Sequence, residues 1–150
     1  MTIKLRYHTI ASLGFGLAFY LFFKSFASAL TCFLVGILVD VDHYFDYIKT
    51  TGWNLNLKQF FHLSYGAKLD RFYLLFHGYE YLLLFATIIV MSDYNLLISA
   101  AGIGYLQHLI LDHIFNPVKP MAYFLTYRLK NGFSKQCLLR DEFIRSLSQD

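Results

Sequence analysis

Charge is scarce in this chain of 150 residues. Asp, Glu, Lys and Arg together make up 15% of it, whereas an average soluble domain holds about 25%. Apolar residues rise to 57%, above the roughly 45–50% of a soluble domain. The length suits one domain better than two. We therefore treat residues 1–150 as a single domain whose composition is shifted toward lipid.

The chain also has only two cysteines and no recognisable nucleic-acid motif. Cys32 lies in an apolar run and Cys137 in the polar tail, and neither shows C-x-x-C spacing. This argues against a disulfide between them and against a thiolate-type metal site. The net charge of +3 is modest, so we expect no nucleic-acid partner.

Long apolar runs dominate what remains. Four of them stand out, at about residues 7–23, 26–41, 72–91 and 96–115. A membrane-spanning helix needs roughly 20 apolar residues, with a range of about 17–25. The third and fourth runs meet that length and the first two are somewhat short. The pattern predicts an all-α fold, an integral membrane bundle of about four transmembrane helices.

Two other interpretations of these runs are open. They could be the core helices of a soluble bundle, although such long, nearly charge-free runs leave little polar surface. The first could be a cleaved signal peptide, with Lys4 and Arg6 before it and Ala27-Ser28-Ala29 as the cleavage site. Lys24 interrupts that run and another apolar run follows at once, which disfavours cleavage.

The basic residues predict the orientation. With four spans, the N-terminus, the loop 43–71 and the tail 116–150 share one side and hold 12 of the 13 Lys and Arg residues. The positive-inside rule then places both termini in the cytoplasm and the chain, as a multi-pass protein, in the cell inner (plasma) membrane. The aromatic residues of the loop and of the tail predict segments lying on the inner leaflet.

Histidine and acidic residues gather at the predicted cytoplasmic ends of all four helices. Ionisable residues at membrane depth are costly and are functional candidates. We expect a metal site built from His8, Asp40, Asp42, His43, His77, Glu80, His108 and Asp112.

Spacing supports this expectation. His108 and Asp112 are four residues apart and share a helix face, and His77 and Glu80, three residues apart in the first turns of the third helix, do likewise. Imidazole and carboxylate without thiolate favour zinc, with manganese or iron as alternatives. The many carboxylates would repel one another at low dielectric, so two ions are favoured over one.

Three segments resemble a known family. Asp40-Val41-Asp42-His43 resembles the Pro-Asp-x-Asp-His motif of the YdjM-like inner-membrane metal-dependent hydrolases. Gly104 to Asp112 resembles that family's Gly-x-x-x-His-x-x-x-Asp helix, and His8 followed by Gly14 resembles its N-terminal segment. The same His-x-x-x-Asp arrangement is distantly similar to that of zinc-dependent phospholipase C enzymes.

The chain departs from that family at two points. Val39 stands where the family has proline, and Phe76 to Glu80 replaces a third-helix motif that often reads His-Arg-Gly-x-Thr-His. The resemblance implies a metal-dependent hydrolase whose third-helix residues differ from the family's usual pattern.

Together these observations predict an enzyme that hydrolyses a phosphoester of a membrane lipid or a lipid-linked substrate through a metal-activated water. Glu80 and Asp42 are the candidate catalytic residues. Two alternatives stay open, an ion-handling or transport protein and a non-catalytic scaffold stabilised by metal. Paired glycines such as Gly102 and Gly104 would also allow an oligomer.

Overall fold

The computed structural model describes residues 5–147, with the side chain of Tyr65 left aside, and its regular elements are helices. In chain order these are α1 (Leu5–Phe23), α2 (Phe26–Leu38), α3 (Val41–Thr51), α4 (Leu57–Tyr65), α5 (Glu80–Met91), α6 (Leu96–Phe115), the 3-10 helix η1 (Pro120–Tyr123), α7 (Leu125–Lys130), α8 (Lys135–Leu138) and α9 (Asp141–Leu147). The prediction of an all-α fold is confirmed.

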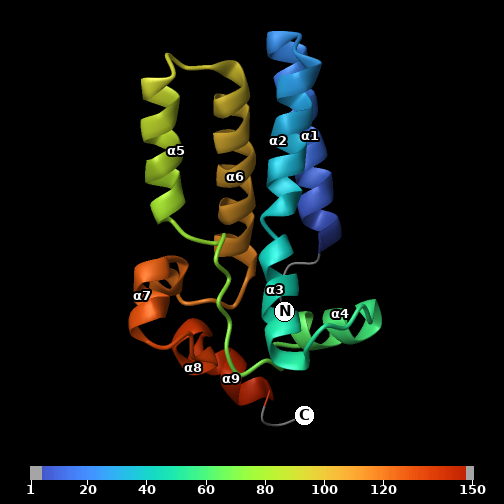
Figure 1. Ribbon diagram of the computed structural model, residues 1–150, viewed down its shortest axis with the longest axis vertical. Helices are drawn as coiled ribbons and strands as arrows, with labels where there is room; N and C mark the ends of the chain where they lie inside the picture. The colour runs from blue at the N-terminus through green and yellow to red at the C-terminus, as the bar shows by residue number, and fades with distance from the viewer. Residues whose placement is uncertain (1–4, 148–150) are drawn as a thin grey trace.

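The helices form two layers. In the upper layer of Figure 1, α1 and α2 make one helical hairpin, α5 and α6 make another, and both turns lie at the same end. Helix α2 packs against α6 and joins the two hairpins. The shorter helices α3, α4, α7, α8 and α9 form the lower layer.

Local sequence explains the ends of these helices. The Ser25 hydroxyl accepts a hydrogen bond from Ser28 N and begins α2. The Asn95 side chain accepts from the backbone of residues 97 and 98 and begins α6. The turn between α5 and α6 is made by Asp93 and Tyr94, whose φ angles are 52° and 56°. Such capping satisfies backbone N–H groups that the first turn of a helix leaves unpaired.

Small residues line the contacts between the long helices. The buried positions are His8, Ser12 and Gly16 in α1, and Ser28, Cys32 and Gly36 in α2. Each set repeats every four residues and so forms one face of its helix. A face of small side chains lets two helix backbones approach closely.

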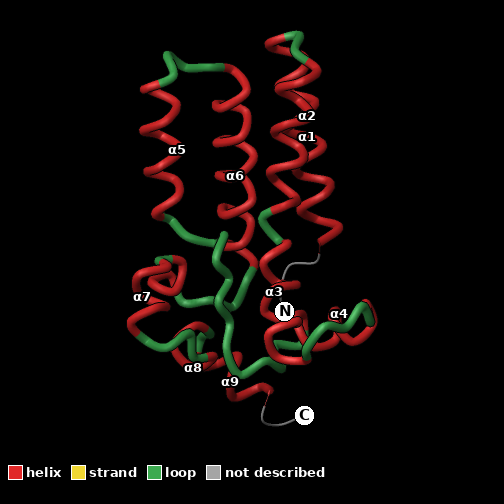
Figure 2. The backbone as a smooth tube through the Cα atoms, in the orientation of Figure 1, coloured by secondary structure: helices red, strands yellow, loops and turns green. Residues whose placement is uncertain are grey.

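The four apolar runs form helices only in part. The first and fourth runs are helical throughout, as α1 and α6. The second stops as α2 at Leu38 and, after a short break, continues as α3, so the expected loop 43–71 contains two helices. The third is helical only from Glu80; residues 66–79, all of them described, form no helix (Figure 2).

The break before Glu80 has a physical cause. Buried side chains bind the backbone of residues 74–78, so these N–H groups have partners outside any helix. Asp46 accepts from Leu74 N and Asp42 accepts from Phe76 N, while the Tyr105 hydroxyl bonds Gly78 N. These tertiary contacts override the apolar pattern from which a helix was predicted.

Within residues 5–147, one helix is long and apolar enough to cross a membrane, namely Phe26–Thr51 when α2 and α3 are taken as one. Helix α5 has only 12 residues. Helix α6 has 20 residues, but Gln107, His108 and Asp112 reduce its mean hydropathy. Length and composition thus support one candidate span, and the bundle of four spans remains a prediction.

Candidate metal centre

The structure brings together every predicted ligand except Glu80. They come from four separate parts of the chain: α1, the α2–α3 junction with the first turn of α3, the irregular segment before α5, and the last turns of α6. Three overlapping groups have ligand atoms close enough to share an ion: His8, His108 and Asp112; Asp40, His77 and His108; Asp42, His43 and His77.

Four atoms make up the centre of this cluster. The Nε2 atoms of His77 and His108 are 3.2 Å apart. Asp40 Oδ1 lies 3.6 Å from each of them, and Asp112 Oδ2 lies 3.2 Å from His77 Nε2 and 3.6 Å from His108 Nε2. Ligand atoms about 2.0–2.2 Å from a tetrahedral zinc ion would be roughly 3.3–3.6 Å apart. The spacing therefore fits a divalent ion.

In the neutral form of each ring, a hydrogen bond on the far side determines which nitrogen faces the centre without a proton. His108 Nδ1 lies 2.8 Å from the carbonyl oxygen of Gly36, which can only accept, so Nδ1 carries the proton. His77 Nδ1 lies 2.9 Å from Asp42 Oδ2, and an ionised carboxylate likewise requires a proton on Nδ1. In the neutral rings, both Nε2 lone pairs then point toward each other and toward two carboxylates. A cation relieves that repulsion.

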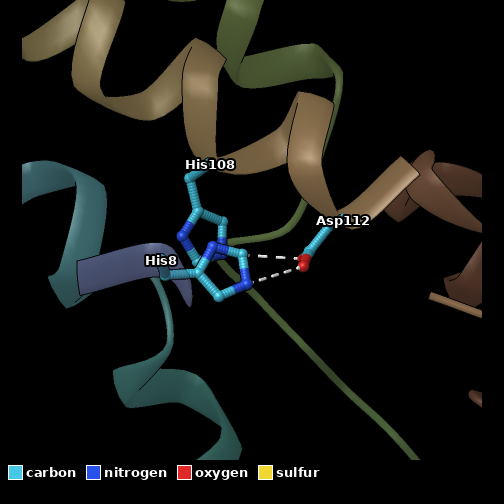
Figure 3. A group of neighbouring side chains, drawn as sticks. All are labelled: His8, His108 and Asp112. Carbon is cyan, nitrogen blue, oxygen red and sulfur yellow. Dashed lines mark ion pairs between the residues drawn. The ribbon is translucent and has the colours of Figure 1, made fainter. Parts of the chain in front are cut away.

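Asp112 is the residue that contacts most of the cluster. Its Oδ1 atom lies 3.2 Å from His8 Nε2 and accepts a hydrogen bond from Asn116, while its Oδ2 atom faces His77 and His108. Figure 3 shows His8 and His108 beside this carboxylate, and the two imidazole rings are stacked with centroids 4.1 Å apart. Asp112 is 2% exposed, so its charge has few partners besides these histidines.

Asp42 occupies a different position from the other carboxylates. One of its oxygens is already bound to His77 Nδ1 and to Phe76 N. This is the arrangement in which a carboxylate orients a metal-binding histidine. His43, by contrast, points its Nε2 toward Asp40 Oδ1 at 3.6 Å and is partly exposed.

Glu80 lies apart from the cluster. Its carboxylate accepts hydrogen bonds from Leu125 N and from Thr126 N and Oγ1, so it joins α5 to the start of α7. The expectation that His77 and Glu80 share a helix face is wrong, because His77 precedes the helix that Glu80 begins. Glu80 therefore belongs to none of the three groups, and its role as a candidate catalytic residue stays a prediction.

Residues outside the predicted set also shape the site. Asp46 and Tyr105 hold the backbone of the segment that carries His77. The pair Asp42 and Asp46, four residues apart on one face of α3, is the sequence signal that could have indicated this role. His113, the residue after Asp112, belongs to none of the three groups. Its Nδ1 atom lies 2.6 Å from the Tyr79 hydroxyl oxygen.

A cavity of about 270 Å³ opens beside the cluster. His8, Asp40, His43, His77 and Asp112 form part of its wall. Much of the rest is apolar and comes from the α2–α3 junction, α4, residues 67–74 and the tail. Part of this wall belongs to a hydrophobic core in the lower layer. Its buried residues include Phe72 and Leu138.

Arg128 of α7 also lines the cavity, and no sequence pattern singled it out. It is 3% exposed. Burial lowers the pKa of its guanidinium, and the charges of Asp42, Glu80 and Asp46 act in the opposite direction. Because an Arg side chain does not lose its proton in proteins, the cavity wall carries a fixed positive charge.

No family model, curated protein or solved structure matches this chain.

Proposed function

We propose that this protein is a membrane-bound, metal-dependent hydrolase. The observation that carries the proposal is the pair of imidazole Nε2 atoms, 3.2 Å apart, with one carboxylate oxygen of Asp40 and one of Asp112 each 3.2–3.6 Å from both of them. A bound zinc ion would lower the pKa of a water molecule and polarise a phosphoryl oxygen. The resemblance to YdjM-like hydrolases agrees with this assignment.

The residues divide into ligands and positioning groups. His77, His108, Asp40 and Asp112 would hold the first ion. Because the two oxygens of Asp112 face different histidines, it is the better candidate to bridge to a second ion beside His8, and Asp42 instead orients His77. Zinc is favoured over manganese or iron because the donors are nitrogen and oxygen at tetrahedral spacing.

The exposed surface of the long helices supports a membrane setting. Large apolar side chains point outward on each of them, for instance Ile10, Phe26, Leu83 and Ile110, while the buried faces of α1 and α2 hold small residues. Helix α5 is apolar and has no buried residue. A soluble bundle would bury its large apolar residues, so this distribution argues against that alternative.

The lower layer would then lie at the cytoplasmic surface. It contains α4 and the exposed Trp53 and Leu55 of the loop before it, which suit the lipid–water boundary. The cavity lies between the two layers, with an apolar wall beside the ligand cluster. This position favours a lipid or lipid-linked phosphoester as the substrate.

Hydrolysis of short-chain lipid phosphoesters by the purified protein tests this function. We expect zinc-dependent product formation, detected by mass spectrometry, that is abolished by chelation and by the double substitution His108→Ala and Asp112→Ala. His62→Ala is the matched control, because His62 is exposed and contacts Lys68. Full activity in the double variant would refute the proposal.

A further inference from the structure

Among the described residues, Arg128 is a buried cation that forms no ion pair with a carboxylate. Its Nε and Nη2 atoms are buried and form no hydrogen bond with other residues in the described part of the chain. No carboxylate within residues 5–147 forms an ion pair with it at 4.0 Å or less. Burying an unpaired charge is costly, so this side chain calls for a functional explanation.

The carboxylates that influence Arg128 from a distance are bound elsewhere. Asp42 binds His77 and Phe76 N, Asp46 accepts from Leu74 N, and Glu80 binds the start of α7. Each is thus held away from the guanidinium by its own hydrogen bonds. Nε and Nη2 of Arg128 therefore have no hydrogen-bond partner among the described residues, and Arg128 lines the cavity that also contains the metal ligands.

We propose that Arg128 binds the anionic phosphoryl head of an amphiphile whose apolar chain lies in the same cavity. This inference rests on the proposed function, because it gives the substrate of that site its chemical class. A guanidinium presents paired N–H donors that match two oxygens of a phosphate. A buried hydroxyl, Ser64 Oγ, has no hydrogen-bond partner among the described residues and lines the same cavity.

The cavity wall is suited to an alkyl chain. Ile37, Leu38, Val41 and Phe61 contribute to it, and several of these side chains are also exposed on the outside of the molecule. A chain could therefore enter from the lipid while its head reaches the positive charge. This arrangement selects phosphoryl amphiphiles over both free inorganic phosphate and uncharged alcohols.

Binding of n-decyl phosphate, measured by isothermal titration calorimetry in an uncharged detergent, tests the proposal. Decanoate, n-decanol and inorganic phosphate are titrated in parallel, each with metal-free and with zinc-loaded protein. Arg128→Met should weaken decyl phosphate binding about 10- to 100-fold, the effect of losing a charge-assisted hydrogen-bonded pair. It should leave decanol binding unchanged, so that the preference for the phosphate over the alcohol disappears.

Lys130→Met is the matched control, because Lys130 lies in the same helix and is exposed. It should bind decyl phosphate as the original protein does. Arg128→Lys keeps the charge but not the paired donors, and should bind with intermediate affinity. This variant covers the case in which Arg128→Met does not fold.

Several outcomes would overturn the inference. Equal binding of decyl phosphate by the original protein and by both Arg128 variants would do so, as would preference for decanoate or for inorganic phosphate. Zinc content measured on the same samples separates the two proposals. A protein that holds zinc but shows no preference for decyl phosphate refutes the role of Arg128 and leaves the metal centre standing.

Discussion

In the proposed metal centre, Asp42 would support the site by orienting a ligand, without contacting the ion itself. Its hydrogen bond to His77 Nδ1, 2.9 Å long, sets the ring so that Nε2 faces the centre. Mutation of such supporting groups costs about 10- to 100-fold in metal affinity. The same oxygen accepts from Phe76 N at 2.7 Å, so it also fixes the backbone of the neighbouring residue.

Asp42→Asn should therefore weaken zinc binding about 10- to 100-fold while the protein still folds. The amide keeps the size of the side chain but loses the negative charge that favours a proton on His77 Nδ1. Competition with a chromophoric chelator measures the affinity. Asp93→Asn is the control, since Asp93 is exposed in the turn between α5 and α6; equal affinities in both variants would contradict the role of Asp42.

The sequence predicts how the candidate ligands in α6 are placed relative to each other, but it does not predict the placement of His77 and Glu80. His108 and Asp112 share a face because they are four residues apart in a helix that forms as expected. His77 and Glu80 were paired on the same argument, but the chain between Phe72 and Tyr79 forms turns and irregular backbone. No sequence pattern indicated Arg128, because nothing in its local sequence distinguishes a buried Arg from the exposed basic residues around it.

At the scale of elements, close helix packing brings the ligands together. Helices α2 and α6 approach at Gly104, where an added Cβ would lie 2.3 Å from the Cys32 carbonyl oxygen. That contact is with backbone, which cannot move aside as a flexible side chain would. The α2–α6 contact in turn sets the position of His108 against the Gly36 carbonyl.

Gly104→Ala should destabilise the protein by about 1–3 kcal/mol, the cost of overpacking a tight contact. Gly14→Ala is the matched control, because its added Cβ would meet nothing within 4 Å and alanine favours a helix. Thermal unfolding in detergent, with and without zinc, measures both. A stability of Gly104→Ala equal to that of the control would show that the helices are not this close.

Helix periodicity and apolar length located α1 and α6 because both are long and uninterrupted. They failed at the start of α5, where Asp42, Asp46 and Tyr105 hold an irregular segment through contacts distant in sequence. They also missed the junction at Asp40, where α2 gives way to α3. Both breaks carry a predicted ligand, His77 or Asp40, so the irregular backbone is what aims these side chains at the centre.

At the scale of the whole molecule, the two helical hairpins place their turns at one end (Figure 1). The ligand cluster lies at the other end, where α1 begins and α6 ends. If the upper layer spans the membrane, the α5–α6 turn and the tail lie on opposite sides. A thiol-reactive, membrane-impermeant maleimide can locate both, because Cys32 is buried and Cys137 of α8 is partly exposed.

In inverted and in right-side-out membrane vesicles, Cys137 should react only from the cytoplasmic face. A variant with Cys137→Ser and Asp93→Cys should react only from the opposite face, since Asp93 lies in the α5–α6 turn. The positive-inside rule supplies the direction. Labelling of both positions from the same side would contradict the multi-pass arrangement.

The zinc content of the purified protein tests the central claim, that distant parts of the chain converge to hold a divalent ion. Inductively coupled plasma mass spectrometry should find at least about one zinc per chain, the occupancy of one closed ligand set, in the original protein and in His62→Ala. The double variant His77→Ala and His108→Ala should lose it. The same zinc content in all three proteins, or none in any of them after zinc loading, would contradict the account.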